Sequence, residues 1–140
     1  MKKNNKLTVE QDYNFQLIGI TTQENDYRLS WGINQQFNLK LLPAENHSIY
    51  NSSYNQHQLF SHYFYMDNNN LTQYHLIANK GDNCILIDEL KNIDFFLIIK
   101  ESTKKDFRIE LAKKLKEINL PITTFDIDPV KLKSKEKLLI

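Results

Sequence analysis

An almost unbroken apolar run late in the chain predicts a buried strand. Residues 93–99 read I-D-F-F-L-I-I, with a single charge at Asp94. A strand with one face in water alternates polar and apolar residues, so a run without alternation indicates a central strand that is covered on both faces. A second apolar stretch, residues 17–20, follows an alternating start at Tyr13. It predicts another strand, half exposed at first and then buried.

Each apolar stretch is followed by the periodicity of an amphipathic helix. Thr21 and Glu24 form a capping-box pattern, which predicts a helix that runs to about Gln36. Its apolar row would be Leu29, Ile33 and Phe37, with Tyr27 and Trp31 beside it. The second helix would be capped by Ser102 or Thr103. Its apolar row would be Phe107, Leu111, Leu115 and Ile118.

The segments between these helices predict shorter strands. Residues 38–42 form a short strand that Pro43 ends, and residues 45–58 have the polar composition of a surface loop. Residues 59–66 and 71–78 predict a hairpin, because the asparagines of the intervening turn tolerate left-handed backbone geometry. Further strands are expected at 84–87 and 122–127.

This order of elements predicts a single α+β domain over residues 1–140. The expected architecture is a two-layer α/β sandwich with a ferredoxin-like β-α-β…β-α-β plan, enlarged by an antiparallel meander. In this plan the strands at 17–20 and 93–99 are central and parallel, since helical crossovers on one face join parallel strands.

Composition narrows the class of protein. The chain carries a net charge of +1 and one cysteine, Cys84, which excludes an internal disulfide. Residues 1–10 form a basic leader that we expect to be flexible, and no apolar segment of a signal peptide follows it. No apolar stretch approaches the length of a membrane span, so we expect a cytoplasmic protein with no membrane partner.

Residues 87–95 read I-D-E-L-K-N-I-D-F and resemble the signature of the IPExxxVDY family of uncharacterised bacterial proteins. The positions that carry the signature are Ile87, Glu89, Ile93, Asp94 and Phe95. The chain departs from it with Asp88 in place of proline, Ile93 in place of valine and Phe95 in place of tyrosine. The resemblance implies no established activity. The missing hydroxyl at Phe95 counts against catalysis at that position.

Glu89 and Asp94 are the first candidates for chemistry. They are a potential carboxylate pair for acid–base catalysis or for a divalent cation. The structural alternative is that Glu89 accepts backbone N–H bonds in its turn and that Asp94 pairs with a lysine or arginine.

Four histidines, His47, His57, His62 and His75, are the second candidates. His62 and His75 fall on paired strands and would meet across the hairpin in one of the two possible registers. Together with Glu89 and Asp94 they raise the alternative of a metal-dependent enzyme, although no carboxylate or thiolate stands at ligand spacing. Cys84 is expected to be a buried apolar side chain.

Two surfaces are candidates for binding. The tyrosines Tyr63, Tyr65 and Tyr74 lie on predicted strands and could stack bases, with Lys131 and Lys133 following a phosphate backbone. The tail, residues 130–140, places Leu138 and Leu139 among lysines. This pattern fits docking on a partner or a second subunit, and it equally fits a frayed, solvated end.

No catalytic constellation or phosphate-binding loop is found in the sequence. We therefore expect a small cytoplasmic protein without cofactor that acts as a non-catalytic binding, interaction or regulatory module. Its partner would be a protein, either another chain or a second copy in a homodimer. The alternatives are an RNA-binding protein and a metal-dependent enzyme.

Overall fold

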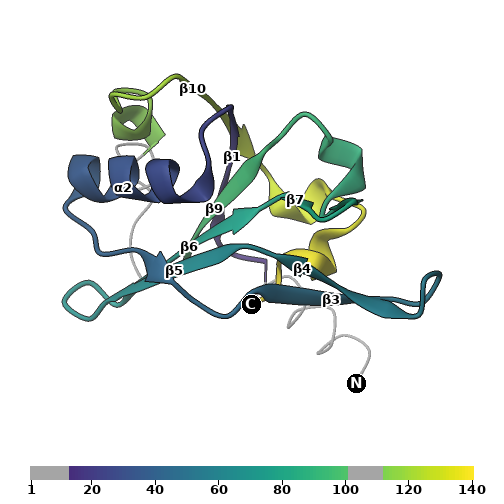
Figure 1. The fold of residues 1–140 in the computed structure, drawn as a ribbon. Helices are drawn as coiled ribbons and strands as arrows, with labels where there is room; N and C mark the ends of the chain where they lie inside the picture. The colour runs from purple at the N-terminus through teal and green to yellow at the C-terminus, as the bar shows by residue number, and fades with distance from the viewer. Residues whose placement is uncertain (1–12, 101–111) are drawn as a thin grey trace.

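The structure is a computed structural model that describes residues 13–100 and 112–140. These residues form a mixed α/β fold around an antiparallel sheet with two helices (Figure 1). The predicted leader lies outside the described residues, as do Ser102, Thr103, Phe107 and Leu111 of the second predicted helix. In the described part of the chain, no helix has the length and apolar character needed to cross a membrane.

Six strands form the main sheet, in the order β10-β1-β9-β6-β5-β2. Their bounds are β1 (Gln16–Thr22), β2 (Leu42–Pro43), β5 (His62–Asp67), β6 (Thr72–Ala78), β9 (Phe95–Lys100) and β10 (Ile122–Ile127). The two apolar strands β1 and β9 are neighbours, with Gly19 opposite Phe96. They run antiparallel, so the predicted parallel pairing of these strands is wrong.

The crossovers explain this difference. β1 and β6 are both antiparallel to β9, so they are parallel to each other with β9 between them. In the same way β9 and β10 are parallel, with β1 between them. A helical crossover joins strands that run in the same direction, but it does not require those strands to be neighbours. The hydrophobic pattern shows which strands are buried and does not show which strands each crossover joins.

Both faces of β9 are buried, which confirms the expectation from its uninterrupted apolar run. Phe95, Leu97 and Ile99 project into one cluster, the helix-side core, while Phe96 and Ile98 project into the opposite cluster, the tail-side core. The helix-side core also contains Leu29, Ile33, Leu76, Leu115 and Ile118. The tail-side core also contains Phe15, Leu17, Phe60, Leu86, Ile87, Leu132 and Leu138.

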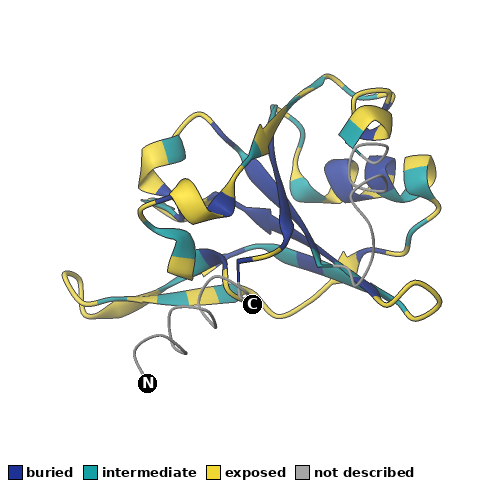
Figure 2. Ribbon diagram, turned by 180° about the vertical axis from the view of Figure 1, so that it is seen from behind, coloured by how far each residue is buried: buried dark blue, intermediate teal, exposed yellow. Residues whose placement is uncertain are grey.

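Among the described residues, helices cover only one of these two faces. The second face is covered by the segment around Ile87 and by the tail, both without α-helix, and Figure 2 shows the buried strands between these layers. The two-layer prediction therefore accounts for the helical layer and misses the layer of irregular chain on the other side of the sheet.

The first helix, α2 (Asp26–Phe37), begins later than its capping-box pattern predicts. Its N-cap is Asn25, whose side chain accepts a hydrogen bond from the Arg28 N–H at 2.9 Å. Thr21 does not cap the helix, because it still belongs to β1, which continues to Thr22. The Thr21 hydroxyl donates instead to the Asn92 carbonyl. Leu29 and Ile33 are fully buried, whereas Tyr27 and Trp31 are exposed.

The predicted surface loop at 45–58 is wrong, because most of it forms an antiparallel hairpin, β3 (His47–Asn51) and β4 (Gln56–Phe60). Its cross-strand pairs alternate between two faces. His47 with Phe60 and Ile49 with Gln58 are more buried than Tyr50 with His57. Polar residues are compatible with such a ribbon when one of its faces meets water.

Short elements complete the described chain. They are β7 (Lys80–Gly81), β8 (Cys84–Ile85), and the 3₁₀ helices η1 (Asp88–Leu90), η2 (Pro129–Lys131) and η3 (Lys135–Leu138). The described part of the second helix comprises residues 112–115, from which Leu115 is fully buried. The tail folds back on its own chain through η2 and η3, so neither the frayed end nor a tail free for docking describes it.

Candidate functional site

The segment that resembles the family signature is a structural loop around η1. Ile87 and Ile93 are buried in the tail-side core, and Phe95 is buried in the helix-side core. The loop is held by Asn79, a fully buried side chain at the end of β6. Its amide nitrogen donates to the carbonyls of Leu90 (2.9 Å) and Ile93 (2.8 Å), and its amide oxygen accepts from the Ile87 N–H (2.8 Å).

Asp94 has the partners of a structural carboxylate. One oxygen lies 2.7 Å from the Lys80 ammonium group, and the other accepts the backbone N–H of Thr22 at 2.8 Å. The lysine partner agrees with the structural interpretation of the sequence. Each oxygen of Asp94 therefore has a partner within the protein.

Glu89 binds the tail, a role that its position in the sequence did not suggest. Its two oxygens accept the backbone N–H groups of Lys133 (2.8 Å) and Ser134 (2.9 Å). The Lys133 N–H lowers the pKa of Glu89 below its ordinary value, and the Ser134 N–H acts in the same direction. The N–H groups come from the distant tail and not, as expected, from the turn that contains Glu89.

His62 and His75 do meet across the β5–β6 pair, at an Nε2 to Nδ1 distance of 2.9 Å. Burial lowers the pKa of His75 to about 3, and the nearby His62 and Lys100 add to this effect. Burial also lowers the pKa of His62, against the opposing effect of the Glu45 carbonyl. Both rings are therefore neutral near pH 7.

The other histidines have separate partners. The His47 Nε2 atom lies 2.6 Å from the Lys137 carbonyl, and the His57 Nδ1 atom lies 3.1 Å from the Ser48 hydroxyl. His47, His62 and His75 line one cavity of about 480 Å³. Among residues 13–100 and 112–140, no three histidine, cysteine or acidic side chains form a group that could hold a metal ion.

Cys84 is only half-buried, which corrects the expectation of a buried side chain. Burial nevertheless raises the pKa of its thiol, so the reactive thiolate is disfavoured at neutral pH.

The three candidate tyrosines belong to the helix-side core. Tyr63 and Tyr74 are buried in it, and Tyr65 packs against it while stacking on Tyr74 with ring centroids 6.1 Å apart. Buried rings cannot stack on nucleic acid bases, because no base can reach their faces.

The tail is divided between buried and exposed side chains. Leu138 is fully buried in the tail-side core, and Leu139 is 38% exposed. Lys131 and Lys133 are exposed, and the Lys100 ammonium group reaches the Ile140 carbonyl at 2.6 Å.

The β3–β4 hairpin forms a surface that the hydrophobic pattern of the sequence does not predict. It projects from the body of the fold, away from the strands of the main sheet (Figure 1). Tyr50 (52% exposed), Tyr54 (70%) and Leu59 (52%) give it an apolar and aromatic outer face. Its signal in the sequence is an absence of charge: residues 46–66 contain no aspartate, glutamate, lysine or arginine, in a chain of which 25% is charged.

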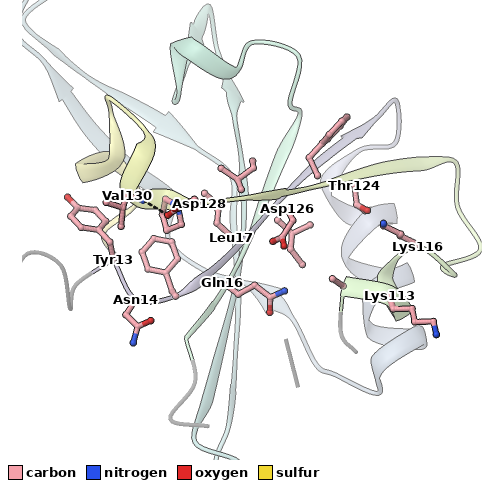
Figure 3. A pocket seen from close by; sticks show the side chains of 16 residues that line it. Tyr13, Asn14, Gln16, Leu17, Lys113, Lys116, Thr124, Asp126, Asp128 and Val130 are labelled. Carbon is pink, nitrogen blue, oxygen red and sulfur yellow. Dashed lines mark hydrogen bonds between the residues drawn. The ribbon is translucent and has the colours of Figure 1, made fainter. Parts of the chain in front are cut away.

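A groove of about 790 Å³ runs past the end of β10 (Figure 3). Tyr13, Phe15 and Val130 contribute apolar lining, Lys113 lies on the second helix, and Lys116 lies in the turn that follows it. The lining also includes Asp126 and Asp128. Two lysines and two aspartates balance one another, so the charge of this groove selects neither anions nor cations.

Comparison with models of known protein families and with curated proteins finds no match for this chain. The resemblance to the IPExxxVDY family therefore stays a prediction that rests on the signature residues.

Proposed function

We propose that this protein is a non-catalytic binding module whose contact surface is the β3–β4 hairpin. The observation that carries the proposal is the pairing of exposed aromatic side chains with a complete lack of charge on a projecting ribbon. The cores of protein interfaces are depleted of charged residues and enriched in aromatic ones. Tyrosine, serine and asparagine, which dominate residues 50–55, are also the residues that dominate antibody contact loops.

The carboxylates support a binding role over a catalytic one. Asp94 is engaged by Lys80 and the Thr22 N–H, and Glu89 is engaged by the tail backbone. General acid–base catalysis requires a group that can exchange a proton with a substrate, whereas every oxygen of these two carboxylates already accepts a hydrogen bond from the chain itself.

The RNA-binding alternative has less support. Tyr63 and Tyr74 are buried, and the hairpin that exposes other tyrosines has no lysine or arginine to pair with phosphates. Electrostatic attraction to phosphate supplies most of the non-specific affinity for nucleic acids. A protein partner in the cytoplasm fits the uncharged hairpin better.

Two further proposals concern the topology of the fold and the family of the chain. The order β10-β1-β9-β6, with a helical crossover after β1 and another after β9, supports a ferredoxin-like plan enlarged by β5, β2 and the hairpin. The residues Ile87, Glu89 and Asp94 support distant membership of the IPExxxVDY family.

Affinity capture with the full chain tests the proposed function. Tyr54→Ser removes the most exposed ring of the hairpin, and Tyr27→Ser is its matched control, because Tyr27 is 68% exposed on α2. Proteins that remain bound to the wild type and to Tyr27→Ser, but not to Tyr54→Ser, support the proposal. Equal capture by all three proteins, or capture by none of them, contradicts it.

A further inference from the structure

The outer edge of β3 has no strand partner in the described chain. β3 pairs with β4 only, from His47 opposite Phe60 to Asn51 opposite Gln56. The far side of β4 is blocked by β7, because a Cβ added to Gly81 would lie 2.6 Å from the Leu59 carbonyl oxygen. Of the two edges of the hairpin, the β3 edge is therefore the one that no other described strand occupies. Unpaired N–H and C=O groups on such an edge are a template for strand addition.

Proteins usually protect open edges with lysine, proline or an inward-pointing charge. β3 reads H-S-I-Y-N and has none of these devices. The whole hairpin is likewise free of aspartate, glutamate, lysine, arginine and proline. An unprotected edge of this kind in a chain that is otherwise rich in lysine indicates an edge that is used.

The lack of charge also favours one particular occupant. A two-fold axis places a strand of one copy against the identical strand of the other copy. A charged residue near the axis would therefore lie close to a residue of the same charge, which is unfavourable. An uncharged strand meets no such repulsion. A different protein could instead complement a charge on the hairpin, and a surface evolved for such a partner has no reason to avoid charge throughout.

We propose that two copies of this chain pair through their β3 strands, antiparallel, into a four-stranded sheet of order β4-β3-β3-β4. This inference rests on the proposed function, since it names the partner of the hairpin. A two-fold axis through the centre of the five-residue strand places Ile49 opposite Ile49. It places Ser48 of each copy opposite Tyr50 of the other. Ser48 and Tyr50 are exposed, so both are available to a neighbouring strand.

Charge-swapped variants of the full chain test this register. Sedimentation equilibrium of the wild type should give twice the chain mass of 16.6 kDa at high protein concentration. Ser48→Lys with Tyr50→Lys, and separately Ser48→Glu with Tyr50→Glu, each place like charges opposite one another. Each double variant should raise the dissociation constant of the dimer by about tenfold or more. An equal mixture of the two double variants should restore a dimer, because opposite charges then face each other.

The control is Gln56→Lys, which places a charge at an exposed position on β4, one strand away from the contact. It should leave the dimer intact. A wild type that stays monomeric at high concentration overturns the inference, as does a dimer that both double variants leave unchanged. In either case the proposed function survives if Tyr54→Ser alone loses captured proteins. It fails together with the inference if Tyr54→Ser also loses nothing.

Discussion

The Nε2 atom of His62 and the Nδ1 atom of His75 share one hydrogen bond of 2.9 Å across the β5–β6 pair. The ring centroids are 5.1 Å apart, so the two nitrogen atoms point almost directly at each other. One proton fits between them, with one ring donating and the other accepting. A second proton at this contact would place two N–H groups face to face.

The surroundings of the histidine pair oppose further protonation. The charged or titratable groups that face it are His47 from β3 and Lys100 from β9, and both act to keep the His75 ring neutral. The other groups that contact the pair are the Glu45 carbonyl, the Gln73 side chain and the Phe64 ring, none of which is titratable.

We therefore predict that the free energy of unfolding falls as the pH is lowered from about 6.5. The pKa of His75 in the folded protein is about 3, below its ordinary value of 6.5. Between these values the unfolded chain binds more protons than the folded one, so stability rises with pH, by at most about 1.4 kcal/mol per pH unit for one such group. Urea unfolding at several pH values between 5 and 6.5 measures this slope. This pH interval lies above the ordinary glutamate pKa of 4.5.

His75→Gln is the variant that isolates this effect, because glutamine keeps a polar side chain but does not titrate. It should flatten the dependence of stability on pH over the same interval. A wild-type stability that stays constant, or increases, as the pH falls to 5 would contradict the role given to the histidine pair.

Asn79 provides a second prediction, about the loop that carries the signature residues. Asn79→Ala leaves two carbonyls and one N–H of this loop without their partner in a buried place. We expect a loss of at least about 3 kcal/mol in the free energy of unfolding. Asn92→Ala, in an exposed turn of the same loop, should change it by less than about 0.5 kcal/mol. Equal effects of the two substitutions in urea unfolding would show that Asn79 does not hold the loop.

Two adjacent leucines test whether the tail is part of the fold. Leu138 is fully buried and Leu139 is 38% exposed. Leu138→Ala should cost about 2–5 kcal/mol through the lost burial and the cavity left behind. Leu139→Ala should cost much less, because its side chain already meets water. Thermal unfolding of both variants compares them directly, and a Leu138→Ala protein as stable as the wild type would mean that the tail does not belong to the core.

The sequence predicted the features that depend on burial. The uninterrupted apolar residues of β9 predict that both of its faces are covered. The structure shows why, because successive side chains such as Phe95 and Phe96 enter different cores. The helical face at Leu29 and Ile33 was predicted for the same reason. These signals depend only on the local spacing of apolar residues.

The features that depend on distant contacts were not predicted. Strand direction depends on which strand each crossover reaches, and the side-chain pattern of β1 and β9 is the same in either direction. Nothing near Glu89 indicates that its partners are the N–H groups of Lys133 and Ser134, more than forty residues away in sequence. The polar composition of residues 45–58 predicts a loop, but a ribbon with one face in water is polar as well, so composition does not distinguish the β3–β4 hairpin from a loop.

Site-specific photo-crosslinking in growing cells tests the role of the hairpin most directly. A photoreactive phenylalanine analogue in place of Tyr54 reports contacts of the hairpin tip, and the same analogue in place of Tyr27 reports contacts of an equally exposed point on α2. A binding hairpin predicts discrete crosslinked products from position 54, including a product at twice the chain mass, and none from position 27. Crosslinks from position 27 alone, or from neither position, would contradict the proposal that the hairpin is the contact surface.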